Sequence, residues 1–251
     1  MVGRHEHGNV IRNWRKCILK GVRKIDFNDN EIMEIQASTL YVLNKENRII
    51  RINERSQTSP PAIFIGKTKK SIFTYFRNDI SQLTIDEINT YIFDSINIID
   101  LCGIIGKYKK VKDIWIGPAY RFNQNEIRNT EEAITVIDGS NKQLLNKHFG
   151  GLINELDDRS PIVGYIVNKE AVSVCCSARK TSKAAEASLM TVEQFRGKGL
   201  AQKVVYGWSK EIFGQGLIPL YSTSWDNLSS QKVAQKLGLV QYGVDFNIST
   251  E

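Results

Sequence analysis

The chain has 251 residues, of which 41% are hydrophobic and 24% charged, and its formal net charge at pH 7 is +7. This composition is typical of a globular protein with one large domain or two small ones, and the basic excess favours anionic partners. Four cysteines without Cys-x-x-Cys spacing exclude a disulfide framework and indicate reduced thiols in a cytoplasmic protein.

The N-terminal stretch and the apolar runs argue against a signal peptide and a membrane span. The polar stretch Met1 to Arg15 has no apolar core behind it, so it is not a signal peptide. The longest apolar stretch, Ile96 to Ile105, is too short to span a bilayer. We therefore expect a soluble cytoplasmic protein that does not enter a membrane.

The first half of the chain predicts a mixture of short helices and strands. His5 and His7 flank Glu6, but two histidines near a terminus without further ligands do not predict a metal site. Together the elements predict a small α+β accessory domain over residues 1–125. The expected helices are 14–22, 31–40 and 86–96, and the expected strand pairs are 39–42 with 49–52 and 62–65 with 71–76.

A basic run, Lys107 to Lys112, is followed by Trp115. Such a run with an aromatic neighbour can bind phosphates and stack bases, but it is more often a solvated surface, and no nucleic-acid-binding motif accompanies it. Nucleic-acid binding is therefore a less favoured alternative. The segment 106–128 is the expected junction between two domains.

The second half predicts alternating strands and helices. We expect a strand at 134–137, a helix at 141–156, and a hairpin of 161–167 and 171–178 around Asn168-Lys169-Glu170. Within that hairpin, Cys175 and Cys176 should point to opposite faces as small packing residues. Further elements are expected as strands at 184–192, 218–223 and 239–248 and as helices at 198–213 and 228–237.

A glycine turn lies between the strand at 184–192 and the following helix. It reads Arg196-Gly197-Lys198-Gly199-Leu200-Ala201. Two glycines before a helix let backbone N–H groups converge on an anion, so the turn predicts a phosphate cradle. Its spacing fits neither the Walker loop nor the dinucleotide-binding motif.

Arg196, Gly199 and Ala201 fill the pattern Arg/Gln-x-x-Gly-x-Gly/Ala, which resembles the pyrophosphate loop of the GNAT superfamily of acyl-CoA N-acyltransferases. The later run Pro-Leu-Tyr-Ser-Thr-Ser-Trp-Asp-Asn at 219–227 resembles the same family. The resemblance covers roughly 130–248. It implies a GNAT-like domain at 126–251, of the α/β class with a mixed sheet, preceded by the smaller α+β domain.

The resemblance also implies a site. Two central strands would splay apart to admit the pantetheine of acetyl-CoA, the co-substrate, and no metal is expected. The implied contacts to the pantetheine are Leu189, Met190, Thr191 and Val192, and those to the pyrophosphate are Arg196, Gly197, Lys198, Gly199, Leu200 and Ala201. Asn227 resembles a family asparagine that contacts the cofactor, although it can equally cap the helix that follows it.

The assignment of catalytic residues rests on fewer observations. Glu186 is the expected general base because it is the one carboxylate within its strand, although a salt-bridged role is an equal alternative. Many relatives carry a tyrosine acid where this sequence has Ala234. Tyr221 and Ser224 are therefore substitute candidates for the acid.

These expectations define an N-acetyltransferase that transfers acetyl from acetyl-CoA to a primary amine by direct attack in a ternary complex. The amine could belong to a small molecule or a protein, and the oligomeric state is open, with a homodimer among the options. The missing tyrosine motivates the main alternative, a non-catalytic acyl-CoA-binding regulatory module.

Overall fold

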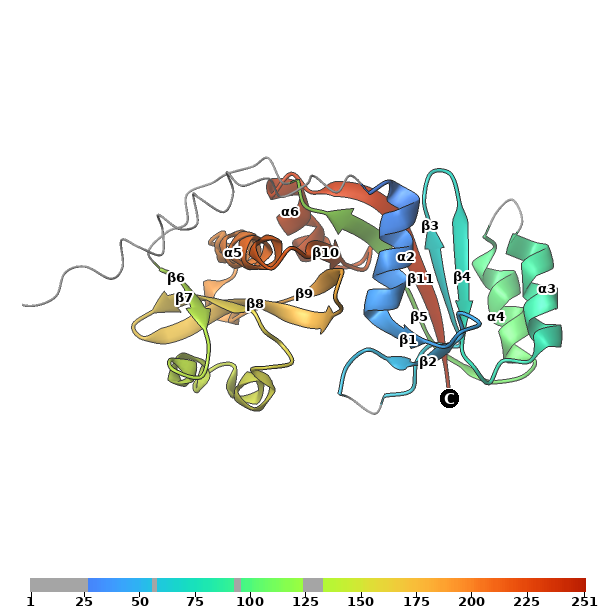
Figure 1. Ribbon diagram of the computed structural model, residues 1–251, viewed down its shortest axis with the longest axis horizontal. Coiled ribbons are helices and arrows are strands. Elements are labelled where there is room, and N and C mark those ends of the chain that lie inside the picture. Colours follow the sequence, from blue (N-terminus) through green and yellow to red (C-terminus); the bar gives the residue numbers. More distant parts are fainter. Residues whose placement is uncertain (1–26, 56–57, 93–95, 124–132) are drawn as a thin grey trace, which may run out of the picture.

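The computed structural model describes residues 27–55, 58–92, 96–123 and 133–251. Its main feature is a nine-stranded sheet in the order β4-β3-β11-β5-β10-β9-β8-β7-β6, accompanied by a separate hairpin of β1 and β2 (Figure 1). Among the described strands, β9 and β10 are the one parallel pair, and the other neighbours are antiparallel. The mixed α/β class expected from the sequence is confirmed.

The strands are β1 (Tyr41–Leu43), β2 (Ile49–Ile52), β3 (Ile63–Lys67), β4 (Ile72–Phe76), β5 (Val111–Arg121), β6 (Ile134–Ile137), β7 (Ile162–Val167), β8 (Glu170–Lys180), β9 (Ala184–Thr191), β10 (Ile218–Ser222) and β11 (Val240–Thr250). The α-helices are α2 (Asp29–Leu40), α3 (Gln82–Ile92), α4 (Ile98–Gly106), α5 (Leu200–Gly214) and α6 (Leu228–Lys236). Three short 3₁₀ helices are η1 (Lys142–Leu145), η2 (Gly150–Glu155) and η3 (Glu193–Phe195).

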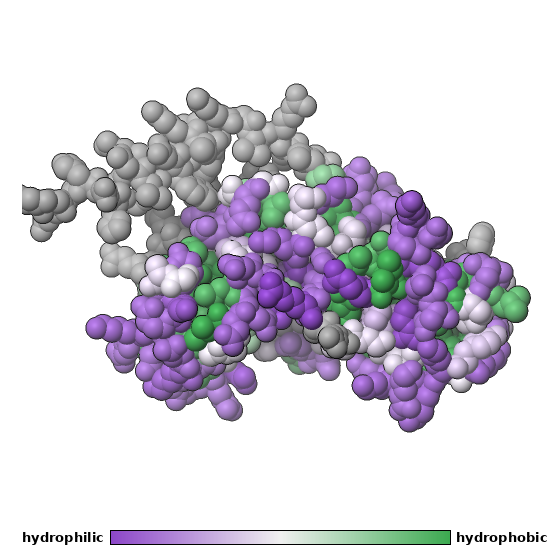
Figure 2. Space-filling model, turned by 60° about the horizontal axis from the view of Figure 1, so that its bottom comes forward, coloured by the Kyte–Doolittle hydropathy of each residue, from purple (hydrophilic) through white to green (hydrophobic). Residues whose placement is uncertain are grey.

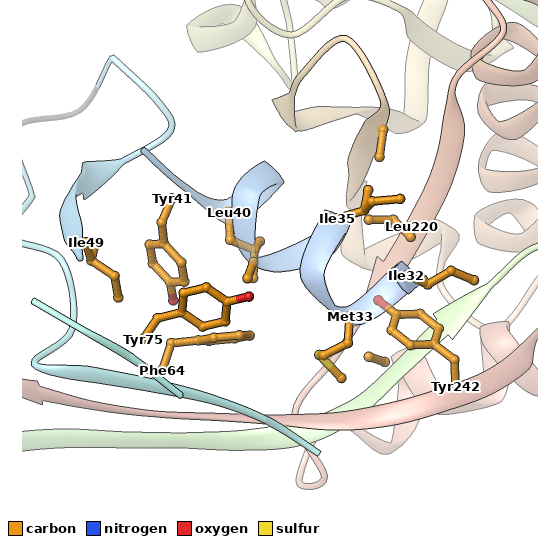
Figure 3. Close-up of a cluster of buried hydrophobic side chains, with 13 residues drawn as sticks. Ile32, Met33, Ile35, Leu40, Tyr41, Ile49, Phe64, Tyr75, Leu220 and Tyr242 are labelled. Atoms are coloured by element: carbon orange, nitrogen blue, oxygen red, sulfur yellow. The ribbon is translucent and has the colours of Figure 1, made fainter. Parts of the chain in front are cut away.

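Helix α2 begins at a capping box. The Asn28 side chain accepts from the backbone of Glu31, whose side chain in turn accepts from the Asn28 N–H. Its apolar face packs on the sheet through Met33, Ile35 and Leu40, next to Leu220 and Tyr242 (Figure 3). Because Leu220 belongs to β10, a helix from the first half of the chain covers part of the sheet built by the second half.

Strand β5 joins the two halves most directly, since it pairs with β10 on one side and β11 on the other. It occupies 111–121, so the expected connecting segment is strand for much of its length. Gly117 permits this insertion, because a Cβ there would lie 1.8 Å from the backbone oxygen of Thr223. Strands from both sides of residue 125 therefore share one sheet, and the division into two domains stays a prediction.

Two helices, α3 and α4, cover the other end of the sheet beside β3 and β4. Helix α3 begins before the expected range 86–96. Helix α4 was not expected; it forms from the apolar run at 96–105, with the Asn97 side chain accepting from the N–H groups of Ile99 and Asp100. In the described residues, no helix is both long and apolar enough to cross a membrane.

The β7–β8 hairpin turns as expected at Asn168 and Lys169, whose φ values of 50° and 63° lie in the left-handed region. Cys175 and Cys176 contribute to the apolar clusters on opposite faces, which confirms their packing role. Burial raises the pKa of both thiols, to about 11 at Cys176.

The continuous helix expected at 141–156 is wrong. The segment instead forms η1 and η2, separated at 146–149, and Gly150 and Gly151 at the start of η2 weaken an α-helix across this point. Figure 1 shows these short helices on one side of β8 and α5 on the other. The predicted helix at 14–22, His5, His7 and Cys17 lie outside the described residues.

Candidate active site

The parallel strands β9 and β10 pair over three positions only, where Ala184–Glu186 face Ile218–Leu220. Beyond Glu186, β9 continues to Thr191 and the described pairing is with β8 alone. The chain after Ser222 stays with β5 instead, since the N–H groups of Thr223 and Trp225 donate to Pro118 and Ile116. The two strands therefore part just after Glu186, which is the splayed geometry that the resemblance implies.

The glycine turn lies at the far end of β9 and leads into α5. Gly197 and Gly199 have φ values of 77° and 76°, a region that residues with a Cβ rarely adopt. Gly199 is the residue that caps α5, and among the described residues no side-chain cap bonds the first N–H groups of this helix. Such a helix start favours an anion, so the turn fits a phosphate group.

The side chains around the turn fix its shape. The Nε of Arg196 donates to the backbone oxygen of Thr191 over 3.3 Å, which ties the turn to the end of β9. The ammonium of Lys198 lies 4.9 Å from the centre of the Phe195 ring. Arg196 and Lys198 are exposed, and Leu200 is buried. The positive charges therefore remain at the surface, where an anion could reach them.

Residues 189–192 form the end of β9 and the position after it, next to the gap. Leu189 packs in the apolar cluster beneath α5, and Met190 packs on the opposite face near η1 and η2. Thr191 bonds the Ser173 hydroxyl over 2.8 Å, and the N–H of Val192 donates to Val172. The backbone of this strand, rather than any one of its side chains, is what borders the gap.

Glu186 lies where the two strands part and is 4% exposed. Its Oε1 accepts from the N–H of Ser222 at 2.8 Å and from the Ser222 hydroxyl at 2.7 Å. Its Oε2 is buried and has no hydrogen-bond partner in the described structure. Burial raises the pKa of Glu186, while the bonds from Ser222 and the charge of Arg179 oppose that rise. One oxygen is thus fixed and the other is available to a proton donor.

Arg179 stands opposite Glu186 in the register of β8 and β9. Its guanidinium pairs with the carboxylate of Glu54, to which Nε donates over 3.0 Å, and Arg159 lies 3.7 Å from the other oxygen of Glu54. Asn53, next in sequence, donates to the backbone oxygens of Thr39 and Lys180. The segment after β2 therefore docks beside the candidate base and links the first half of the chain to it.

The candidate acids lie around the start of α6. Tyr221 is 3% exposed, and its hydroxyl lies 2.6 Å from that of Ser230. Burial raises the pKa of Tyr221 to about 12 despite this bond. The backbone oxygen of Ser224 accepts from Asn227 and Gln231, which places Ser224 in the turn before the helix.

Asn227 caps α6, since its side chain accepts from the N–H of Ser230 at 3.1 Å. Its structural role is thus established, and a contact with the cofactor stays a prediction. Ala234 is fully buried among the residues that pack α6 against α5. Tyr221 faces the same apolar cluster as Ala234, whereas Glu186 projects from the opposite face of the sheet.

The sequence reasoning missed three polar residues near Glu186. Ser222 is its hydrogen-bond donor, and Asp245 and Gln36 are buried and bonded to each other at 2.7 Å. A weak signal for Asp245 was present, because a carboxylate between the apolar residues Val244 and Phe246 is buried where both faces of its strand are covered. No local pattern indicated Gln36, which reaches this region through tertiary packing.

The basic run is largely paired with carboxylates. Lys107 contacts Glu87 and Lys110 contacts Glu251 at 2.5 and 2.6 Å, and Lys109 bonds Asp79 at 2.5 Å. The surface view shows separate hydrophobic patches on a mainly hydrophilic face (Figure 2). Within the described ranges, no group of three or more His, Cys, Asp or Glu side chains is arranged to hold a metal ion.

Splayed parallel strands, a glycine turn at the end of one of them and a helix that starts there together define the class of acyl-CoA N-acyltransferase folds. Residues 159–243 match the sequence model of the family described as GNAT acetyltransferase, over less than half of the chain. The matched part of the chain has the fold of the GNAT superfamily, and this match supports acyl transfer as the general chemistry. The search of curated proteins gave no match.

Several solved structures are similar to this chain at low sequence identity. A putative GNAT acetyltransferase from Novosphingobium aromaticivorans is 12% identical, with 57% of this chain and 68% of that chain covered and a TM-score of 0.47. A GCN5-related N-acetyltransferase-like protein from Streptococcus suis is 17% identical, with coverages of 76% and 86% and a TM-score of 0.46. A GNAT-family acetyltransferase from Colwellia psychrerythraea is 12% identical, with coverages of 83% and 80% and a TM-score of 0.44.

Proposed function

We propose that the protein is a cytoplasmic N-acetyltransferase that transfers an acetyl group from acetyl-CoA to a primary amine by direct attack within a ternary complex. The observation that carries this proposal is the position of Glu186. It is a buried carboxyl group with one unpartnered oxygen, at the point where β9 and β10 separate. A base is needed there if an amine on one side of the sheet is to attack a thioester held in the gap.

The residues present fit acetyl-CoA as a substrate. The glycine turn from Arg196 to Ala201 and the uncapped start of α5 suit its pyrophosphate. The backbone at 189–192 borders a gap that β10 does not fill, which suits the pantetheine arm. When bound, acetyl-CoA supplies the thioester carbonyl that accepts the amine.

Glu186 acts on the amine in this proposal. Its Oε2 accepts a proton from the amine nitrogen, while Ser222 holds Oε1 and so fixes the plane of the carboxyl group. Burial assists, because a raised pKa brings the carboxylate closer to the proton affinity that a base needs near neutral pH. Arg179 and Glu54 border the same place and limit which acceptors fit.

Tyr221 is the proposed acid, which donates its hydroxyl proton to the departing sulfur. A phenol with its pKa raised to about 12 is fully protonated at neutral pH, as an acid must be. Ser230 holds the Tyr221 hydroxyl and can return a proton to it. Ser224, in the adjoining turn, is the alternative donor.

The test is a calorimetric titration of acetyl-CoA into the purified protein, followed by an assay of free CoA released with a panel of small-molecule amines and peptides. Binding with amine-accelerated release is expected. The Gly199→Trp variant should lose binding, because an indole would fill the turn at a residue with φ of 76°.

Two outcomes would redirect the proposal. Binding without turnover across the panel would favour the non-catalytic acyl-CoA-binding module, for which the apolar Ala234 is the supporting observation. If Gly199→Trp bound acetyl-CoA as tightly as the parent protein, the assignment of the turn to the pyrophosphate would be wrong.

A further inference from the structure

Two carboxylate oxygens stand out among the buried polar side-chain atoms of the described residues. They are Oε2 of Glu186 and Oδ1 of Asp245, and neither has a hydrogen-bond partner. Glu186 is 4% exposed and Asp245 is 1% exposed. A buried carboxylate with one oxygen unpartnered ionises unfavourably, so two of them near each other cannot both ionise easily.

The two groups share one face of the sheet. Ser222 bonds Glu186 from β10 and pairs with Ala119 of β5. On β11, Asp245 pairs with Gly117 of β5, and Gly243 pairs with Ala119. These small residues leave little between the two carboxyl groups except the overlying helix α2. The electrostatic influence of Glu186 on Asp245 follows from this arrangement, and after burial it is the strongest cause that raises the pKa of Asp245.

Helix α2 holds Asp245 in place through Gln36. The Gln36 amide donates to Oδ2 of Asp245 over 2.7 Å and accepts from the hydroxyl of Tyr242 over 2.8 Å. Figure 3 shows the Tyr242 ring beneath α2, with its hydroxyl directed toward that helix. One oxygen of each carboxyl group is therefore fixed, and the other is left unpartnered.

The other groups that face the pair are few. Tyr242 on the same strand and Tyr41 at the end of α2 both have raised pKa values, so both are neutral. Arg179 is the one cation of the described structure whose charge lowers the pKa of Glu186. The neighbours of Asp245 on β3 and β5 are Gly66 and Gly117, which carry no charge.

We propose that Asp245 is a positioning residue for Glu186, and that the two carboxyl groups form one coupled pair that holds one proton and one negative charge at neutral pH. The inference rests on the proposed function where it takes Glu186 as the base. Arg179 favours the negative charge on Glu186, and Asp245 keeps the proton. The buried region then carries a single charge rather than two.

The pair also keeps its charge during the reaction. The amine nitrogen gives a proton to Oε2 of Glu186, which becomes neutral. The repulsion from Glu186, which adds to burial in keeping Asp245 protonated, is then gone, so Asp245 gives up its proton to water more readily and can take over the charge. One proton enters the pair and one leaves it, and no second charge has to be buried.

The experiment compares the pH dependence of unfolding of the parent, Asp245→Asn, Glu186→Gln and the double variant. A buried acid with a raised pKa makes the folded state less stable as pH rises from the unfolded pKa, about 3.9 for Asp, to the folded pKa. Asp245→Asn should therefore gain stability relative to the parent over that window. In the Glu186→Gln background, the double variant is compared with Glu186→Gln. The upper end of the pH window in which Asp245→Asn adds stability should lie about one pH unit lower or more than in the parent background.

The outcomes decide the proposal. A window with the same upper end in both backgrounds would show that the two groups titrate independently, and would overturn the coupling whether or not the protein is an enzyme. If Asp245→Asn does not fold, carboxyl ¹³C NMR titration of Asp245 in the parent and in Glu186→Gln makes the same comparison. Asp113→Asn, an exposed carboxylate on β5, is the control and should show no such window.

Enzyme kinetics separate this role from a merely structural one. Asp245→Asn resembles the neutral acid, so the acid limb of kcat/KM, which reports Glu186, should stay within about half a pH unit, while kcat falls. If Asp245→Asn instead displaced Glu186, the acid limb of kcat/KM would move to a different pH. An inactive parent protein would contradict the proposed function and leave the result of the stability comparison standing.

Discussion

Glu186 accepts two hydrogen bonds from Ser222, through the backbone N–H and the hydroxyl, across the last stretch where β9 and β10 remain neighbours. This relationship fixes the carboxyl group at the start of the gap between the strands. It also lowers the pKa of Glu186 against the larger effect of burial. The proposed base is therefore positioned by the same strand whose departure opens the site.

The first prediction concerns Glu186 itself. Glu186→Gln keeps the shape and one acceptor for Ser222 but removes the base, so kcat should fall by about 10²- to 10⁴-fold. Acetyl-CoA affinity should change little, because the glycine turn is intact. Steady-state kinetics and calorimetry measure the two effects. The control is Glu46→Gln, an exposed residue of the β1–β2 turn, and equal losses in both variants would contradict the assignment.

The second prediction concerns the pH at which the base becomes active. Activity should fall as pH drops through the folded pKa of Glu186, which lies above the ordinary value of about 4.3. Ser222→Ala removes a donor to the ionised form, so the acid limb should move to higher pH by about one unit. The pH profile of kcat/KM measures this shift. Ser38→Ala, whose hydroxyl bonds only within α2, should leave the limb in place.

Parts of the fold and of the site could be predicted from the sequence where the evidence for them lies in neighbouring residues. The glycine turn and the hairpin at Asn168-Lys169 could be predicted because left-handed backbone positions leave a trace in the sequence. Glu186 could be nominated because it interrupts its own strand. The position of β5 between β10 and β11 could not, since strand order depends on contacts far apart in the sequence. Gln36 was missed for the same reason.

The third prediction separates backbone strain from ligand binding. Gly199 and Gly216 have φ values of 76° and 75°, so alanine at either position should destabilise the fold by about 1–2 kcal/mol. Gly199 lies in the turn and Gly216 beyond the end of α5. Only Gly199→Ala should weaken acetyl-CoA binding, which calorimetry measures at a temperature where both variants are folded. Equal affinities would place the pyrophosphate elsewhere.

The fourth prediction concerns the acid. Tyr221→Phe should lower kcat with little change in the KM for acetyl-CoA, and the parent should show no loss of activity from this group below about pH 10, because burial raises the pKa of Tyr221 to about 12. Ser230→Ala leaves the phenol but removes its 2.6 Å partner. It should cost about 1 kcal/mol of stability and less activity than Tyr221→Phe. The reverse order of activities would point to Ser230 instead.

The last prediction tests the strand that joins the two halves of the chain. A Cβ at Gly117 would lie 1.8 Å from the backbone oxygen of Thr223 and 2.7 Å from the Cα of Ser224, and neither atom can move without separating β5 from β10. Gly117→Ala should therefore destabilise the protein by more than about 3 kcal/mol, since backbone cannot yield as a flexible side chain does. Gly103→Ala, within α4 and without neighbours near its Cβ, should instead stabilise by up to about 1 kcal/mol. Chemical denaturation measures both, and a Gly117→Ala protein as stable as the parent would contradict the close approach on which the shared sheet depends.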